Sequence, residues 1–319
     1  MPNIFAKLAA YRQRKEEASS PPNTDENISA KFKKSRRWQM MDNTFQWKMA
    51  WVLAVVLACS FLSCAEAKAE ENEARVPIIM YHLVTENSRY IGSWGIRPAA
   101  LREDLEFLKQ NGYNTVVMAD LINFVEKGTP LPENPIVLTF DDGNFSDYKY
   151  LFPLLQEFEM KAVISIIGIT TDEITQKHAD NPKGTYPNLT WGQVKELHES
   201  GIIEVQSHGF NVHKKAGASK LKKESPGTYH ARLLTDLQKL DDRCMEHLGY
   251  KPNTFCYPYG NISKESQAVL EELGYKASLS CQEGMNIIRQ GEKGDLFKLN
   301  RVNRASGRSA ESILAKLNK

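Results

Sequence analysis

The chain of 319 residues has few cysteines and no strong excess of charge of either sign. Two of its five cysteines, Cys59 and Cys64, lie in an apolar run, and the other three form no CxxC pair. This pattern argues against a disulfide framework or a structural zinc site. Residues 1–69 hold 11 Lys and Arg against 6 Asp and Glu, and the remainder holds 30 against 33. The larger part therefore lacks the basic excess of a nucleic-acid-binding protein.

Long apolar runs are also scarce, apart from one near the N-terminus. Residues 49–65 carry no charge, a length that is short for a membrane-spanning helix but sufficient for a signal-peptide core. Lys48 and the basic run KFKKSRRW precede it, which fits a cytoplasmic N-terminus. The sequence predicts a basic, disordered region at 1–48, a signal-peptide core or membrane anchor at 49–65, a linker at 66–75 and an exported domain at 76–319. That domain is expected to be extracellular, periplasmic or at the cell surface, and attached to the membrane if the segment is not cleaved.

The exported part alternates β-branched stretches with helical patterns, and it contains no dinucleotide-binding glycine fingerprint. Leu101, Leu105 and Leu108 share one face of a helix that ends at Gly112. Alternating helices and buried strands predict a parallel sheet. The expected fold is α/β, a distorted (β/α) TIM-like barrel that forms a single catalytic domain. Its strands are expected at 76–82, 114–120, 135–142, 161–168, 202–209, 253–260, 276–280 and 296–303.

Reactive side chains fall at the carboxyl ends of these expected strands. The stretch PIVLTFDDG ends in two adjacent carboxylates, Asp141 and Asp142, while His208 follows another strand and His213 comes five residues later. In parallel barrels the chemistry gathers at this end, so we expect these side chains to meet. One carboxylate and two imidazoles suit zinc and related cations. Asp142, His208 and His213 are the expected metal ligands, and Asp141 is then free as general base for a metal-bound water.

Each of these residues also has a plain structural interpretation. The two aspartates alone fit a turn with helix-capping side chains, and single histidines are more often surface or core residues than ligands. Their joint position at strand ends is what favours a site. A barrel glycosidase is a weaker alternative, because its two carboxylates must lie about 5–9 Å apart across the scissile bond, and the two histidines would then have no role.

The stretches TFDDG, SHGFNVH and YPYG, in this order, resemble the first three motifs of the polysaccharide deacetylases, carbohydrate esterase family 4. The resemblance covers about residues 76–305 and implies a NodB-homology barrel and a hydrolase of amide bonds. The two histidines are five rather than the usual four residues apart, and no histidine follows His247. Instead the segment MYH carries His82 near the start of the domain. These departures resemble the branch that de-N-acetylates poly-β-1,6-N-acetylglucosamine in biofilms.

That resemblance implies further roles. His82 is the general acid, and the backbone N–H of Tyr257 binds the oxyanion. A carboxylate near His82 is expected to keep its imidazolium protonated near neutral pH. Arg301, which we place in the last strand, either orients Asp141 in place of the motif-three arginine that TFCYPYG lacks, or forms a structural ion pair. The remaining candidates are expected to have no catalytic role: Cys256 as a buried small hydrophobe, and His178, His198, His230 and His247 as solvated residues.

The expected function is metal-dependent removal of acetyl groups from an extracellular polymer that contains N-acetylglucosamine, with poly-β-1,6-N-acetylglucosamine as the leading substrate. Peptidoglycan, chitooligosaccharides and O-acetylated sugars are alternatives, and so is a sugar-binding module on an inactive deacetylase scaffold. Zinc is the leading metal, with Co, Ni, Fe and Mn as alternatives. The acetylated polysaccharide is the expected partner, no nucleic acid is expected, and the sequence does not predict an oligomeric state.

Overall fold

The computed structural model describes residues 72–181, 184–185 and 187–318. The predicted N-terminal region and apolar segment at 49–65 lie outside the described residues. Within those residues, no helix is long and apolar enough to cross a membrane. Residues 73–75, which the sequence analysis assigns to a linker, instead belong to strand β1 (Glu73–Val76), which pairs antiparallel with β11 (Asn286–Arg289).

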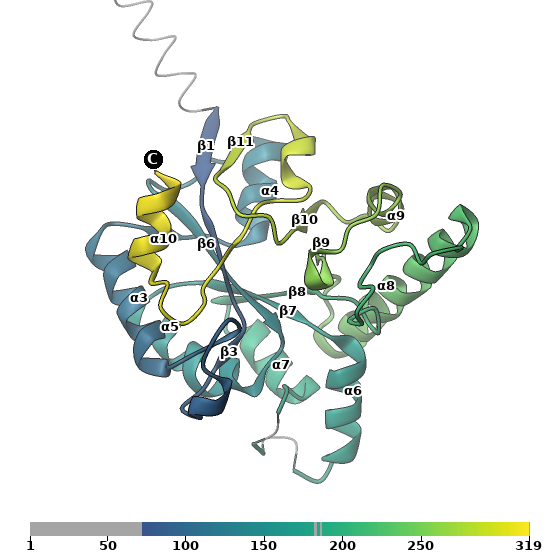
Figure 1. Ribbon diagram of the computed structural model, residues 1–319, viewed down its shortest axis with the longest axis horizontal. Coiled ribbons are helices and arrows are strands. Elements are labelled where there is room, and N and C mark those ends of the chain that lie inside the picture. Colours follow the sequence, from purple (N-terminus) through teal and green to yellow (C-terminus); the bar gives the residue numbers. More distant parts are fainter. Residues whose placement is uncertain (1–71, 182–183, 186, 319) are drawn as a thin grey trace, which may run out of the picture. The chain divides into compact units, whose positions relative to one another are not determined.

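The core of the described part is an eight-stranded sheet whose pairs are all parallel. Its central strands are almost completely buried, because helices cover the outer face of the curled sheet (Figure 1). In spatial order the strands are β10 (Ala277–Leu279), β9 (Thr254–Cys256), β8 (Ile203–Ser207), β7 (Ala162–Ile166), β6 (Pro135–Asp142), β2 (Ile78–Tyr81) and β12 (Val302–Asn303), with β5 (Asn114–Thr115) beside the start of β6.

The sheet curls into a half-barrel, as the predicted distorted barrel requires. The first and last strands, β2 and β12, lie side by side. The edge strand β10 approaches the segment before β12 through an isolated bridge between Leu279 and Leu299. All carboxyl ends of the parallel strands therefore face one end of the sheet.

Helices surround this sheet (Figure 1), and among them α3 (Pro98–Gln110) lies where the hydrophobic pattern predicts a helix. Leu101, Leu105 and Leu108 are fully buried on the inner face of α3, and Thr190 with Gln193 forms a capping box at the start of α7. The helices are α3 (Pro98–Gln110), α4 (Met118–Lys127), α5 (Phe152–Phe158), α6 (Gly168–Lys177), α7 (Trp191–Glu199), α8 (Pro226–Leu248), α9 (Ser266–Glu272) and α10 (Ala310–Leu317).

Three of the expected strands are wrong for most of their length. In the stretch 253–260 only Thr254–Cys256 is strand. The stretch 114–120 gives only the two residues of β5, and α4 begins at Met118. The Asp120 carboxylate accepts a hydrogen bond from the N–H of Val117 (3.0 Å), and the buried Glu204 accepts one from Ala119 (3.1 Å). These caps stabilise a helix where the apolar pattern predicts a strand. In the stretch 296–303 only Val302 and Asn303 are strand, so Arg301 immediately precedes the strand.

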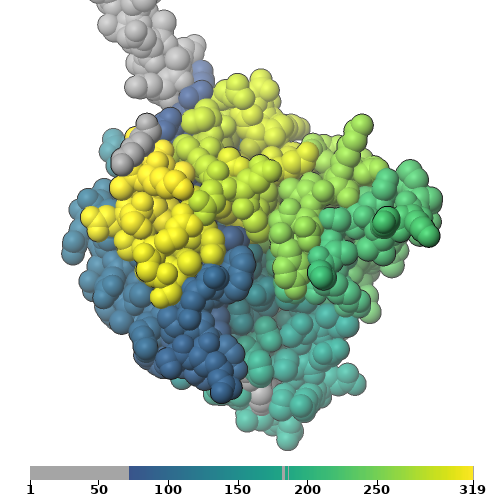
Figure 2. All heavy atoms as spheres, viewed as in Figure 1, coloured from purple at the N-terminus to yellow at the C-terminus, as the bar shows by residue number. Residues whose placement is uncertain are grey.

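The C-terminal segment packs against the beginning of the domain (Figure 2). Arg304 forms a buried double ion pair with Asp104 of α3, with distances of 2.6 and 3.1 Å. The same carboxylate accepts hydrogen bonds from the Tyr81 hydroxyl (3.1 Å) and from the N–H of Ala310 (2.8 Å). One buried carboxylate thus ties together α3, β2 and α10.

Asp104→Ala should destabilise the domain strongly, because it leaves the Arg304 guanidinium buried without a counter-charge. We expect the free energy of unfolding to fall by about 3–5 kcal/mol. Urea denaturation of the single variants and of the Asp104→Ala/Arg304→Ala double variant measures this coupling. A loss under about 0.5 kcal/mol in Asp104→Ala would contradict the role given to this pair.

Candidate functional site

A cavity of about 360 Å³ lies at the carboxyl end of the sheet. It brings together five of the seven predicted site residues, which come from the ends of β2, β6 and β8 and from the loop after β8. The lining residues are His82, Trp94, Asp141, Asp142, His208, His213, Tyr259 and Cys281.

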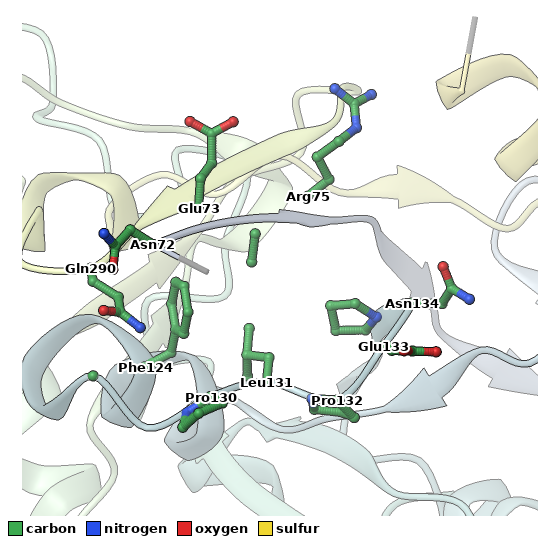
Figure 3. A pocket seen from close by; sticks show the side chains of 13 residues that line it. Asn72, Glu73, Arg75, Phe124, Pro130, Leu131, Pro132, Glu133, Asn134 and Gln290 are labelled. Atoms are coloured by element: carbon green, nitrogen blue, oxygen red, sulfur yellow. The ribbon is translucent and has the colours of Figure 1, made fainter. Parts of the chain in front are cut away.

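A larger cavity, of about 760 Å³, lies at the opposite end of β6, around Pro135 (Figure 3). Its walls are β1 and the proline-rich loop after α4, with Phe124 among the lining side chains. Among the described residues that line it there is no histidine or cysteine, and Glu73 and Glu133 are its carboxylates. Because its residues lack the mixed imidazole and carboxylate donors, we place the site in the smaller cavity.

Asp141 is held in a buried, ionised state by Arg301. The guanidinium contacts both carboxylate oxygens, at 2.8 and 2.9 Å, and both side chains are almost completely buried. Burial alone would raise the pKa of Asp141. Its charged neighbours, of which Arg301 has the largest effect, followed by His208 and His82, together outweigh burial and hold that pKa well below its usual range. Arg301 is itself fixed by the carbonyl of Ser280 (2.8 Å). The contact with Asp141 fits both predicted roles of Arg301, the orientation of Asp141 and a structural ion pair.

The turn after β6 directs the two adjacent aspartates differently. Asp142 has φ 79° and Gly143 has φ 64°, both in the left-handed region that costs a non-glycine residue energy. A Cβ atom on Gly143 would lie 3.1 Å from the Ile166 side chain. This strained turn points Asp142 toward the two histidines, whereas Asp141 remains against Arg301.

Asp142, His208 and His213 form a set of three potential metal ligands. Asp142 Oδ1 lies 3.5 Å from His208 Nε2 and 3.2 Å from His213 Nε2, and one atom from each residue lies within 4.8 Å of the others. Asp142 Oδ1 is buried, and within the described part of the chain it has no hydrogen-bond partner. An orphaned carboxylate oxygen between two imidazole nitrogens fits a divalent cation.

The protonation of His208 supports this assignment. Its Nδ1 lies 2.8 Å from the carbonyl oxygen of Cys256, which places the proton on Nδ1 and leaves the lone pair of Nε2 facing Asp142. Burial lowers the pKa of His208 despite the neighbouring aspartates. The ring is therefore neutral near pH 7, the state that a metal ligand requires.

A second group of donors, Asp141, His208 and Cys256, is equally compact. Its chemistry is less suitable for a cation. Both oxygens of Asp141 already contact Arg301, and burial raises the pKa of the Cys256 thiol well above its usual value. A protonated thiol is a poor metal ligand. We therefore prefer the set that contains His213.

His82 lies close to Asp141. Its Nε2 is 3.9 Å from Asp141 Oδ2, the oxygen that also accepts a hydrogen bond from Arg301. Burial lowers its pKa, and this effect outweighs the opposing influence of Asp141 and Asp142. The expectation that a carboxylate keeps His82 protonated near neutral pH is therefore wrong for this structure. The protonated form of His82 predominates only at a pH below this lowered pKa.

The sequence predicts that the backbone N–H of Tyr257 faces the cavity, and this prediction is wrong. This N–H donates to the carbonyl of Leu279 at 3.0 Å, because β9 continues its pairing with β10 to this residue. The Tyr257 side chain is buried, with its hydroxyl 2.8 Å from that of Ser266. Tyr259, two residues later, lines the cavity instead and has φ 57°.

Sequence reasoning missed the residues that form the rim and part of the wall. Trp94 and Tyr259 are more than half exposed, and their rings lie 4.7 Å from those of His82 and His213 respectively. Cys256 is buried as predicted, but its sulfur also lies 3.4 Å from both Asp141 oxygens. Trp94 precedes the short strand β4 (Gly95–Ile96), which pairs with β3 (Leu83–Val84). No sequence motif predicts that β3 and β4 pair.

Arg301→Gln should shift the pH dependence of catalysis. In the wild type the pKa of Asp141 is depressed, so the base remains ionised and active well below the usual range of aspartate. Without the guanidinium, burial would raise that pKa. As the pH falls, the variant would therefore lose activity at a higher pH than the wild type does. A kcat/KM profile from pH 4 to 9 measures the shift. An acidic limb at the same pH in both proteins would show that Arg301 does not tune Asp141.

Comparison with known proteins adds independent information. Residues 128–278 match the family model described as polysaccharide deacetylase. The poly-beta-1,6-N-acetyl-D-glucosamine N-deacetylase of Escherichia coli (strain K12) is 31% identical over 205 residues, which cover 58% of this chain and 30% of that relative. This chain thus spans less than a third of the relative's length.

Two solved structures show the same fold. The de-N-acetylase from Aggregatibacter actinomycetemcomitans has a TM-score of 0.64 at 24% identity, covering 76% of this chain and 98% of that one. IcaB from Ammonifex degensii has a TM-score of 0.61 at 23% identity, covering 77% and 97%. At this identity the likeness concerns the fold.

Proposed function

Because this chain carries a polysaccharide deacetylase domain, of a family that hydrolyses amide bonds, we propose that it removes N-acetyl groups from a polymer containing N-acetylglucosamine and releases acetate. Poly-β-1,6-N-acetylglucosamine is the substrate we propose first, since that is what the Escherichia coli relative is named for. The observation that carries the proposal is the meeting of Asp141, the Asp142–His208–His213 set and His82 in one cavity.

A divalent cation held by Asp142, His208 and His213 would act as a Lewis acid on the acetyl carbonyl and acidify a water molecule. Asp141 accepts the proton of the attacking water, since Arg301 keeps its carboxylate ionised. We take zinc as the first choice of metal, because two imidazoles and one carboxylate suit it.

His82 acts as the general acid in this proposal. Its imidazole lines the same cavity as Asp141, so base and acid flank one reacting centre. Protonated His82 donates to the nitrogen that leaves as the amine of a glucosamine unit. Trp94, which packs edge-on against the His82 ring, helps to hold that ring in place.

Tyr259 replaces Tyr257 as the proposed backbone donor to the oxyanion. The turn it occupies is closed by hydrogen bonds from Gly260 to Tyr257 and from Asn261 to Pro258. The left-handed φ of Tyr259 places this residue at the cavity, where an N–H can stabilise the charge that develops on the acetyl oxygen.

A panel of acetylated polymers tests the substrate. We expect free amines to form fastest on β-1,6-linked N-acetylglucosamine oligomers, and more slowly on chitooligosaccharides and peptidoglycan. A faster reaction on either of the last two would move the substrate assignment to that polymer. Binding of all three without any release of acetate would favour the sugar-binding alternative.

We also propose that the domain works outside the cytoplasm, because the charge-free stretch at 49–65 follows a basic segment. Cell fractionation should find the protein in the membrane or outside the cell, and N-terminal sequencing near Ala67 would indicate cleavage rather than anchoring. Full-length protein in the cytosol would contradict this location.

A further inference from the structure

A lysine-rich loop directly follows His213, which lines the catalytic cavity. The loop between β8 and α8 contains five lysines within residues 214–223, although the chain from residue 70 onward is slightly acidic overall. Four of them, Lys214, Lys215, Lys222 and Lys223, are exposed. We call these four the lysine edge.

The loop is anchored to the wall of the site. Lys214 directly follows the proposed ligand His213, and the carbonyl of Lys215 accepts a hydrogen bond from the Asn261 side chain at 3.1 Å. Gly217, with φ 56°, packs so closely on the Tyr259 turn that an added Cβ would lie 2.7 Å from the carbonyl of Pro258. The first half of the lysine edge is therefore held beside the turn that lines the cavity.

Nearby acidic side chains are already neutralised by other partners. Glu265 pairs with the fifth lysine of the loop, Lys220, at 2.8 Å. Glu224 pairs with Arg232 at 2.7 Å and accepts a hydrogen bond from the N–H of Leu221. Among the described residues, no ion pair involves the four lysines of the edge. Within the described part of the chain, these four charges are therefore not offset by a carboxylate partner.

We propose that the lysine edge selects by charge the sugars that flank the reacting one. This inference rests on the proposed function, because each turnover converts a neutral acetamide into an amine that is cationic at neutral pH. A polymer segment with such an ammonium beside the reacting unit is repelled by the lysine edge, whereas a fully acetylated segment is not. The enzyme should therefore act at dispersed positions and avoid making contiguous runs of glucosamine.

Long-range Coulomb energies set the size of the effect. Four unit charges about 12 Å from a new ammonium, in water at about 0.01 M salt, should disfavour it by about fivefold. The repulsion should nearly vanish at about 0.5 M salt, where the screening length is about 4 Å.

Two pentamers of β-1,6-linked N-acetylglucosamine test the proposal, one fully acetylated and one with its central unit already deacetylated. The readout is kcat/KM for acetate release per remaining acetyl group. We expect the wild-type protein to prefer the fully acetylated pentamer about fivefold at low salt and to lose this preference at about 0.5 M NaCl.

The lysine variants give the matched comparison. Lys214→Gln/Lys215→Gln should reduce the preference, and substitution of all four lysines by Gln should bring the ratio close to one. Lys127→Gln/Lys161→Gln removes two exposed lysines near the opposite ends of the strands, after α4 and before β7, and should leave the ratio unchanged.

A wild-type ratio near one, or a preference that survives both high salt and the four substitutions, would overturn the role of the lysine edge while the proposed deacetylase activity stands. No acetate release from either pentamer by the wild-type protein would instead contradict the proposed function, and the inference with it.

Discussion

Asp141→Asn should lower the rate of acetate release by about 10²–10⁴-fold, the usual contribution of a general base. Asn has nearly the shape of Asp but cannot accept the proton of the attacking water. It also removes the negative charge that faces the buried guanidinium of Arg301 at 2.8 and 2.9 Å. Some loss of stability is therefore expected together with the loss of catalysis.

Bound metal separates the catalytic effect from a structural one. Asp142, rather than Asp141, is the proposed ligand, so metal content measured by elemental analysis should be the same in Asp141→Asn as in the wild type. Asp142→Asn is the matched variant, one residue away, and should lose metal. Turnover by Asp141→Asn within about tenfold of the wild type would mean that another group takes the proton.

His82→Ala should retain metal and lose about 10²–10⁴-fold in amide hydrolysis, because the amine is a poor leaving group without a proton donor. An activated acetyl ester should lose much less, since its leaving group needs little protonation. His82 contacts Asp141 at 3.9 Å, and its removal leaves the three proposed ligands unchanged. An equal loss on amide and ester would rule out the role of proton donor.

The pH dependence of the wild type provides a second readout for His82. Because burial lowers the pKa of His82, its acid form should decline as the pH rises through that lowered value. Amide hydrolysis should therefore fall on the alkaline side of this pKa, and the same limb should be absent for the activated ester. An identical alkaline limb with both substrates would assign it to a different group.

The fold followed from the sequence wherever hydrophobic pattern and caps agreed. The strand β2 is entirely apolar or aromatic, β6 and β7 are mostly apolar, and β8 alternates apolar and polar residues. The helices α3 and α7 have both a periodic face and a terminal signal. The expected strand at 114–120 was wrong because Asp120 caps the start of α4 from within the stretch, and Glu204, 85 residues beyond Ala119, adds a second cap. A distant capping contact leaves no local signal.

The site followed from the sequence where side chains are placed by strand ends. Asp141, Asp142 and His208 sit at the carboxyl ends of strands, so topology alone brings them together. Tyr257 was misassigned because its N–H continues the pairing of β9 with β10, one residue beyond Cys256, and is therefore already used. The lowered pKa of His82 was also missed, since it depends on burial by packed neighbours, including the exposed Trp94 at the rim.

The proposed catalytic metal site is tested most directly by acetate release from a fully acetylated β-1,6-linked N-acetylglucosamine oligomer. The release is measured with the full chain before and after a chelator is added. We expect acetate and free amine to form in equal amounts, the reaction to stop when a chelator removes the metal, and zinc to restore it. Undiminished acetate release by metal-free protein, or none by protein with zinc bound, would contradict the assignment of Asp142, His208 and His213 as ligands of a catalytic metal.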